Sequence, residues 1–179
     1  MDTILHLEAW HDVFVVIGGA SGALVGLLFV VVSLHFGRID AAADTNTRAT
    51  LDGARFNTVH LLTVLAEAIA VLTPQPALFL GAELVALNLV GVRQPFIFIY
   101  RYAGKRVTIS HEGKFPSKLL ATIIFAYVLG VAGGAVVLRH GEWGLYLVTL
   151  SCLAKIARSV LTAWMLIFSL SHARRAEPN

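Results

Sequence analysis

The sequence predicts an all-α membrane protein, in which residues 1–179 form a single integral membrane domain of five transmembrane helices. The first observation is composition: 57% of the residues are hydrophobic, only 14% are charged, and the mean hydropathy is +0.75. A soluble domain carries about 25% charged residues, and a short chain has too much surface to cover with so few. The composition excludes a soluble enzyme, a nucleic-acid-binding domain and a disordered chain. We expect the lipid bilayer as the main partner.

The second observation is the length of the apolar stretches. A helix needs about 20 mostly apolar residues to cross the roughly 30 Å hydrocarbon layer. Five stretches are candidates for such a helix. The expected spans are residues 13–36, 56–72, 76–100, 119–138 and 144–170.

The segment between the second and third spans, residues 73–76, reads TPQP. Proline does not continue a helix interior, and the residue before a proline avoids the helical region. We therefore expect a tight turn here, so that the two spans form an antiparallel hairpin. The second span is short and contains Glu67. A re-entrant hairpin over residues 56–100, which never crosses the membrane, remains the alternative.

The third observation is the distribution of basic residues between the loops. With five spans, residues 37–55, residues 101–118 and the tail after residue 170 share one side and carry ten Lys and Arg residues. The loops of the opposite side carry only Arg139. Short loops rich in Lys and Arg stay in the cytoplasm. We therefore expect the N-terminus outside and the C-terminus inside, in a bacterial-type plasma (inner) membrane.

The loop over residues 101–118 holds half of these bases and one acid. Each base near an anionic membrane surface contributes about 1 kcal/mol of attraction. We expect these side chains to contact lipid headgroups, with docking of a soluble acidic partner as the alternative. They are Arg101, Lys105, Arg106, Lys114 and Lys118.

Small residues recur at helical spacing in two spans. Gly18, Gly22 and Gly26 follow one another every four residues in the first span, and Gly130 and Gly134 do so in the fourth. This spacing lets two helix backbones approach closely, and close packing drives helix association in lipid. The glycines either pack within one chain or form a subunit interface. We expect a homo-oligomer.

Ionisable residues inside the predicted spans are the main functional signal. Each costs at least about 2.5–3.5 kcal/mol at the centre of an isolated helix, so the chain has to pair them or hydrate them. The set forms either a path for ions, protons or a small polar solute, or a purely structural ion-pair network. It consists of Glu67, Glu83, Arg93, Lys155 and Arg158.

Their spacing predicts where these groups meet. Glu67 lies seven residues before the first proline of the turn and Glu83 lies seven after the second, so a hairpin puts both carboxylates at nearly equal depth. Lys155 and Arg158 occupy neighbouring layers of the fifth span. We expect spans two, three and five to surround a polar interior, with Glu83 on the polar face of the third and Asn88 off that face. Spans one and four then face lipid or neighbouring subunits.

His60 lies on the same stripe of the second span as Glu67. It can act as a proton relay or a metal ligand, but no His, Cys or carboxylate stands three or four residues further on. We interpret it mainly as a hydrogen-bonded packing histidine. Cys152 lies in an apolar stretch, and we interpret it as a small buried hydrophobe. We expect no metal site and no cofactor.

These patterns support three candidate functions, which follow from the best supported to the least. The first is an oligomeric channel or small transporter with a polar ion or proton path lined by spans two, three and five. The second is a non-catalytic accessory or assembly subunit of a larger membrane complex, with structural charges and a glycine face that docks on another membrane protein. An enzyme comes last, because no nucleophile and base stand at a supporting spacing. We therefore expect no catalytic residues.

Overall fold

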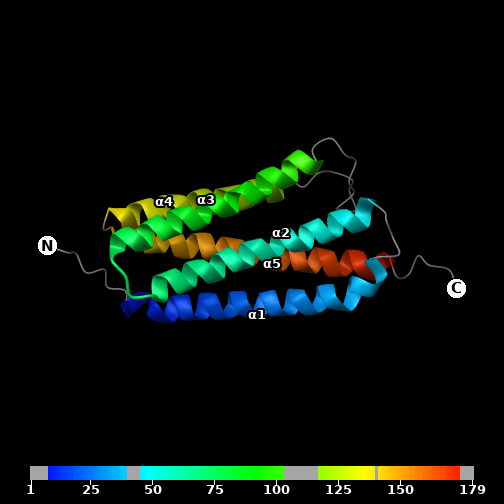
Figure 1. Cartoon of the computed structure of the whole chain (residues 1–179), viewed down its shortest axis with the longest axis horizontal. Coiled ribbons are helices and arrows are strands. Elements are labelled where there is room, and N and C mark those ends of the chain that lie inside the picture. Colours follow the sequence, from blue (N-terminus) through cyan, green and yellow to red (C-terminus); the bar gives the residue numbers. More distant parts are fainter. Residues whose placement is uncertain (1–7, 40–44, 103–116, 140, 174–179) are drawn as a thin grey trace.

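The computed structural model describes residues 8–39, 45–102, 117–139 and 141–173. These residues form five α helices, each long and apolar enough to cross a membrane (Figure 1). The predicted all-α fold with five helices of spanning length is confirmed, and it is consistent with a multi-pass membrane protein. The helices are α1 (Glu8–Ile39), α2 (Thr45–Leu72), α3 (Ala77–Tyr102), α4 (Ser117–Leu138) and α5 (Trp143–Ala173).

The apolar segments of these helices lie within a few residues of the predicted spans. They are Glu8–Ser33, Gly53–Leu72, Ala77–Ile97, Ala121–Leu138 and Trp143–Trp164. Several helices continue beyond them, because a helix needs backbone hydrogen bonds and not apolar side chains to propagate. Residues 73–76 stand between α2 and α3, where the prolines supply no backbone N–H.

The helices run up and down in three layers, with α1 on one side, α2 and α5 in the middle, and α3 and α4 on the other side (Figure 1). Within the described residues, α1 contacts α2 and α5, while α4 contacts α3 and α5. We call the end where α2 ends and α3 begins the proline end, and the end where α5 finishes the C-terminal end. Outward-facing side chains such as Phe29, Val90 and Phe125 are large, apolar and exposed, which suits a lipid environment.

Most of the buried apolar side chains gather in the half of the bundle nearest the proline end. Every helix contributes to this cluster, which fills the space between α1, α2 and α5 and between α3, α4 and α5. In lipid such contacts stabilise through close packing and dispersion, since exposure to lipid tails carries little hydrophobic cost. The cluster includes Phe14, Ile17, Val64, Ala68, Val71, Leu80, Leu84, Val137, Leu145 and Val148.

The predicted packing glycines divide into two groups. A Cβ added at Gly18 would lie 3.2 Å from the Cβ of Ala68 on α2, and one at Gly134 would lie 3.0 Å from Val85 on α3. At Gly22 and Gly26 an added Cβ would meet nothing within 4 Å. The structure therefore uses part of the glycine pattern inside the chain, and the described bundle leaves the rest of the first-span glycines uncovered.

The closest approach of α4 and α5 generates a prediction for stability. A Cβ added at Gly133 would lie 2.8 Å from the carbonyl oxygen of Gly144, so Gly133→Ala has to push the two backbones apart. We expect it to lower the free energy of unfolding in detergent micelles by about 1–3 kcal/mol, as other overpacked sites do. The matched control is Gly26→Ala, at an open position, which should not destabilise. Equal stability of the two variants would contradict this packing.

Candidate functional site

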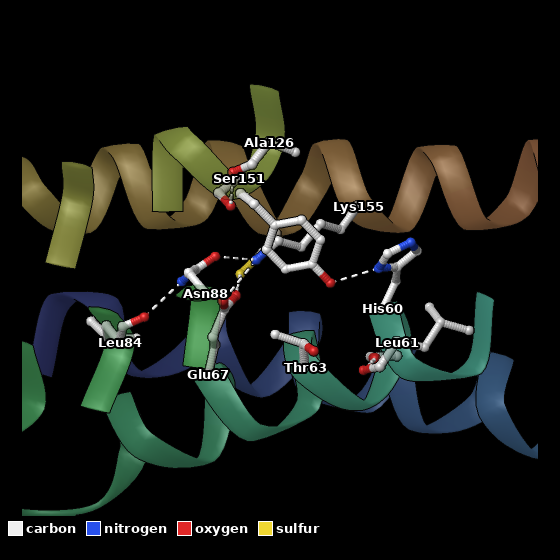
Figure 2. Close-up of polar contacts among 12 residues, drawn as sticks. His60, Leu61, Thr63, Glu67, Leu84, Asn88, Ala126, Ser151 and Lys155 are labelled. Atoms are coloured by element: carbon white, nitrogen blue, oxygen red, sulfur yellow. Dashed lines mark hydrogen bonds and ion pairs between the residues drawn. The ribbon is translucent and has the colours of Figure 1, made fainter. Parts of the chain in front are cut away.

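The centre of the site is an ion pair between α2 and α5. The Nζ atom of Lys155 lies 2.7 Å from Oε1 of Glu67. Both side chains are 0% exposed, so the two charges are removed from solvent and lipid by the surrounding helices (Figure 2). At this distance the interaction is a charge-assisted hydrogen bond, the strongest type that side chains form.

Three further groups complete the surroundings of the pair. Lys155 Nζ also donates to Oδ1 of Asn88 at 2.7 Å, and the thiol of Cys152 donates to Oε2 of Glu67 at 3.0 Å. The ammonium lies 4.6 Å from the ring centroid of Tyr127, within range of a cation–π interaction. Four helices therefore meet at the pair. A buried ion pair is tolerated only when its remaining donors and acceptors are satisfied in this way.

Helical spacing places each partner on the buried stripe of its helix. On α5 the buried residues Val148, Cys152, Lys155 and Ser159 follow one another at three- and four-residue intervals. On α3, Asn88 continues a stripe that begins with two buried leucines four and eight residues before it. Asn88 is held there by a hydrogen bond from its Nδ2 to its own helix.

A second polar group lies next to the pair, toward the C-terminal end. Nδ1 of His60 and the hydroxyl of Tyr127 are 2.6 Å apart, and the Tyr127 ring thus contacts both His60 and Lys155 (Figure 2). Nδ2 of Asn57 donates to the backbone carbonyl of Ser159 at 3.1 Å. His60 Nε2 and Ser159 Oγ are buried and have no hydrogen-bond partner among the described residues.

The residues predicted from the spacing do not all meet. Glu67, Lys155 and His60 come together. Glu83 is exposed and accepts a hydrogen bond of 2.8 Å from Nε2 of Gln75, beside the turn, because it stands one residue off the buried stripe of α3. Arg93 is exposed. The carboxylates of Glu67 and Glu83 therefore do not meet in the structure, contrary to the expectation from the sequence.

Arg158 is partly buried and stands three residues beyond Lys155 on α5. Its Nη1 donates to the hydroxyl of Thr162 one turn further on α5, at 2.5 Å. The polar stripe predicted for the fifth span thus splits into two: one part enters the interior at Lys155 and Ser159, and the other follows the partly buried side of the helix at Arg158 and Thr162.

Two residues of the site were excluded or missed by the sequence reasoning. Asn88 was placed off the polar face of the third span because the face was defined by Glu83. The leucines at four-residue intervals before Asn88 indicate the buried face of the helix more reliably than Glu83 does. An acid near a helix end can reach water and therefore does not have to face the interior. Tyr127 belongs to the fourth span, which was expected to face lipid. A phenol deep in a span needs a hydrogen-bond partner. This requirement was the sequence feature that pointed to an inward position for Tyr127.

Several predicted contacts lie outside what the structure describes. Lys105, Arg106 and Lys114 are outside the described residues, and Arg101 and Lys118 stand at helix ends whose side chains are not described. Headgroup binding by this loop stays a prediction. Among the described residues, no group of three or more His, Cys, Asp and Glu side chains lies close enough together to hold a metal ion.

In comparisons with known proteins, no family, no curated protein and no solved structure matches the chain. The five apolar helices are consistent with a multi-pass membrane protein, and the buried pair gives the bundle an ionisable interior. Its function has to be inferred from that interior.

The buried pair generates a prediction for stability. We expect Glu67→Gln and Lys155→Met each to lower the free energy of unfolding in micelles by about 3–5 kcal/mol, because each leaves one uncompensated buried charge. The double variant removes both charges and should lose less than the sum of the two. Glu83→Gln is the matched control, with an expected change of less than about 0.5 kcal/mol. Additive losses in the double variant would mean that the two charges do not interact.

Proposed function

We propose that the protein is a small transporter or channel that carries a cation or a proton across the bilayer through the polar interior shared by α2, α3, α4 and α5. The observation that carries the proposal is the fully buried Glu67–Lys155 pair. Ionisable side chains inside membrane helices are rare, and they typically mark ion pathways and proton relays. We propose no catalytic activity for the chain.

Stability alone is a poor explanation for the pair. Replacing a buried ion pair by apolar groups of similar size is often neutral or stabilising. This chain already joins its helices by close glycine contacts, such as Gly133 on α4 against α5. The close glycine contacts therefore provide another source of helix association. Burying the two charges costs free energy, and a function in transport explains why the chain contains them.

The uneven distribution of polar groups favours a transporter over a permanently open channel. From the pair toward the C-terminal end, the interior holds the polar residues His60, Asn57 and Ser159 beside apolar ones such as Leu61 and Ile123. From the pair toward the proline end, it is filled by the apolar cluster. A cargo can thus reach the pair from one side along polar atoms, whereas passage to the other side requires the apolar half to open. This alternation is how transporters expose a central site to each side in turn.

The direction of this access follows from the sequence-based orientation. If the N-terminus is outside, as the ten basic residues of three segments indicate, then the C-terminal end is the cytoplasmic end. The orientation and the bacterial-type inner membrane are part of this proposal. Access to the pair is then cytoplasmic.

An accessory subunit is the second candidate, and two observations favour it. The pair is enclosed and its oxygens and ammonium have partners, which is what a purely structural pair requires. The face of α1 with Gly22 and Gly26 is open in the described bundle, and small residues of this kind suit close contact with another membrane helix. In this case α1 docks on a larger complex or on a second copy of the chain.

Flux measurements test the proposal. In proteoliposomes, the purified protein should dissipate an imposed gradient of protons or of Na⁺ or K⁺ faster than empty vesicles do. The folded double variant Glu67→Gln/Lys155→Met should lower this flux at least about tenfold, which corresponds to about 1.4 kcal/mol in the barrier. The control double variant Glu83→Gln/Arg93→Met keeps the interior unchanged and should retain the flux.

The two candidates predict different outcomes. Wild-type protein that moves neither protons nor cations would overturn the transport proposal. The accessory subunit would be supported by three results together. The wild type carries no flux, other membrane proteins co-purify with it, and Gly22→Leu abolishes their association.

A further inference from the structure

Each oxygen of the Glu67 carboxylate already has a hydrogen-bond partner. Oε1 of Glu67 is bonded to Lys155, and Oε2 accepts from Cys152. Lys155 is itself bonded to Asn88. A Na⁺ or K⁺ ion that approaches the carboxylate therefore has to displace an ammonium group that is already in contact with it, and both ions carry the same charge as that ammonium.

The two partners of the pair on α3 and α4 pack closely against the facing helix. A Cβ added at Gly130 would collide with the side chain of Asn88, and one added at Gly91 would collide with the ring of Tyr127. Asn88 and Tyr127, which contact the ammonium, are therefore tightly packed. A proton needs no added space, because it moves by exchange between groups already in contact.

His60 is placed to receive a proton next to the pair. A neutral imidazole carries one proton on its two nitrogens, and Nδ1 is occupied by the hydroxyl of Tyr127. Nε2 lies on the far side of the ring from that hydroxyl (Figure 2). His60 and Ser159 are each 1% exposed. Neither His60 Nε2 nor Ser159 Oγ has a hydrogen-bond partner among the described residues. A buried polar atom without a partner costs free energy, which a hydrogen-bonded water molecule would remove.

We infer that the cargo of this interior is the proton, and that it enters from the C-terminal end at His60 Nε2, with the unpartnered hydroxyl of Ser159 in the same half of the interior. The inference rests on the proposed function, since it names the species that the transporter carries. The donor is hydronium or a water molecule. The step uses the tautomer that carries its proton on Nδ1 and donates it to the Tyr127 hydroxyl. An N–H bond then forms at Nε2, water or hydroxide is left behind, and the imidazolium keeps its Nδ1–H on that hydroxyl.

The new charge on His60 acts on the pair. The charged and titratable groups that face His60 are Tyr127 from α4, Lys155 and Arg158 from α5, and Glu67 further along α2. A second cation close to Lys155 favours loss of a proton from its ammonium. The N–H bond of Lys155 breaks and an O–H bond forms at Oε1 of Glu67, across 2.7 Å. The pair thereby becomes neutral, and one positive charge remains on His60.

The test compares two replacements of His60 in proteoliposomes with a pH-sensitive dye inside and a K⁺ diffusion potential as the driving force. His60→Asn keeps a polar atom near the position of Nδ1, facing Tyr127, but removes Nε2. His60→Gln keeps a polar atom near Nε2 that does not bind a proton. Both should lower proton flux by about 100-fold, the lower end of what a positioned proton acceptor contributes. The matched control is His11→Asn, at an exposed position near the opposite end, which should keep the wild-type flux.

A third variant, Ser159→Ala, removes only the unpartnered hydroxyl and should fold. We expect it to reduce proton flux several-fold, which gives a result even where the His60 variants do not fold. Wild-type protein that moves Na⁺ or K⁺ as fast as protons would overturn the inference and leave the proposed function intact. Wild-type proton flux in folded variants of both His60 and Ser159 would also overturn it. Absence of every flux in the wild type would overturn the proposed function itself.

Discussion

The ion pair between Glu67 and Lys155 is the constraint on which the rest of the bundle depends. An unpaired charge at this depth is strongly destabilising, so α2 and α5 have to stay in register at this level. Asn88 brings in α3, and Tyr127 brings in α4, because each contributes to the surroundings of the ammonium. The glycines at 91 and 130 are small for the same reason: a side chain at either position would move these two partners.

The helical class and most helix positions were predictable from the sequence, because crossing a bilayer requires length and apolarity, and both can be counted directly. Part of the site was predictable too. An acid and a base deep in apolar spans have few ways to avoid a large cost, so the association of Glu67 with Lys155 follows from their presence. His60 and Glu67, seven residues apart, both lie on the buried side of α2.

The other contacts depend on helix rotation, which spacing within one helix does not determine. Glu83 and Asn88 both lie on α3, and only the packing of its leucines against the other helices decides that Asn88 turns inward. Tyr127 shows the same limit. The fourth span is apolar along most of its length, so nothing local distinguishes the side of its single phenol. Cys152 was expected to be buried, but its contact with Glu67 requires the relative height of two helices distant in sequence.

The most direct test of the central claim is the contact between the two charges in a lipid bilayer. Solid-state NMR of protein with isotope-labelled Lys and Glu can measure the nitrogen–carbon dipolar coupling between Lys155 Nζ and Glu67 Cδ. A hydrogen bond of 2.7 Å to Oε1 predicts a strong coupling that disappears in Glu67→Gln and persists in Glu83→Gln. A folded wild-type protein in bilayers without this coupling would contradict the account.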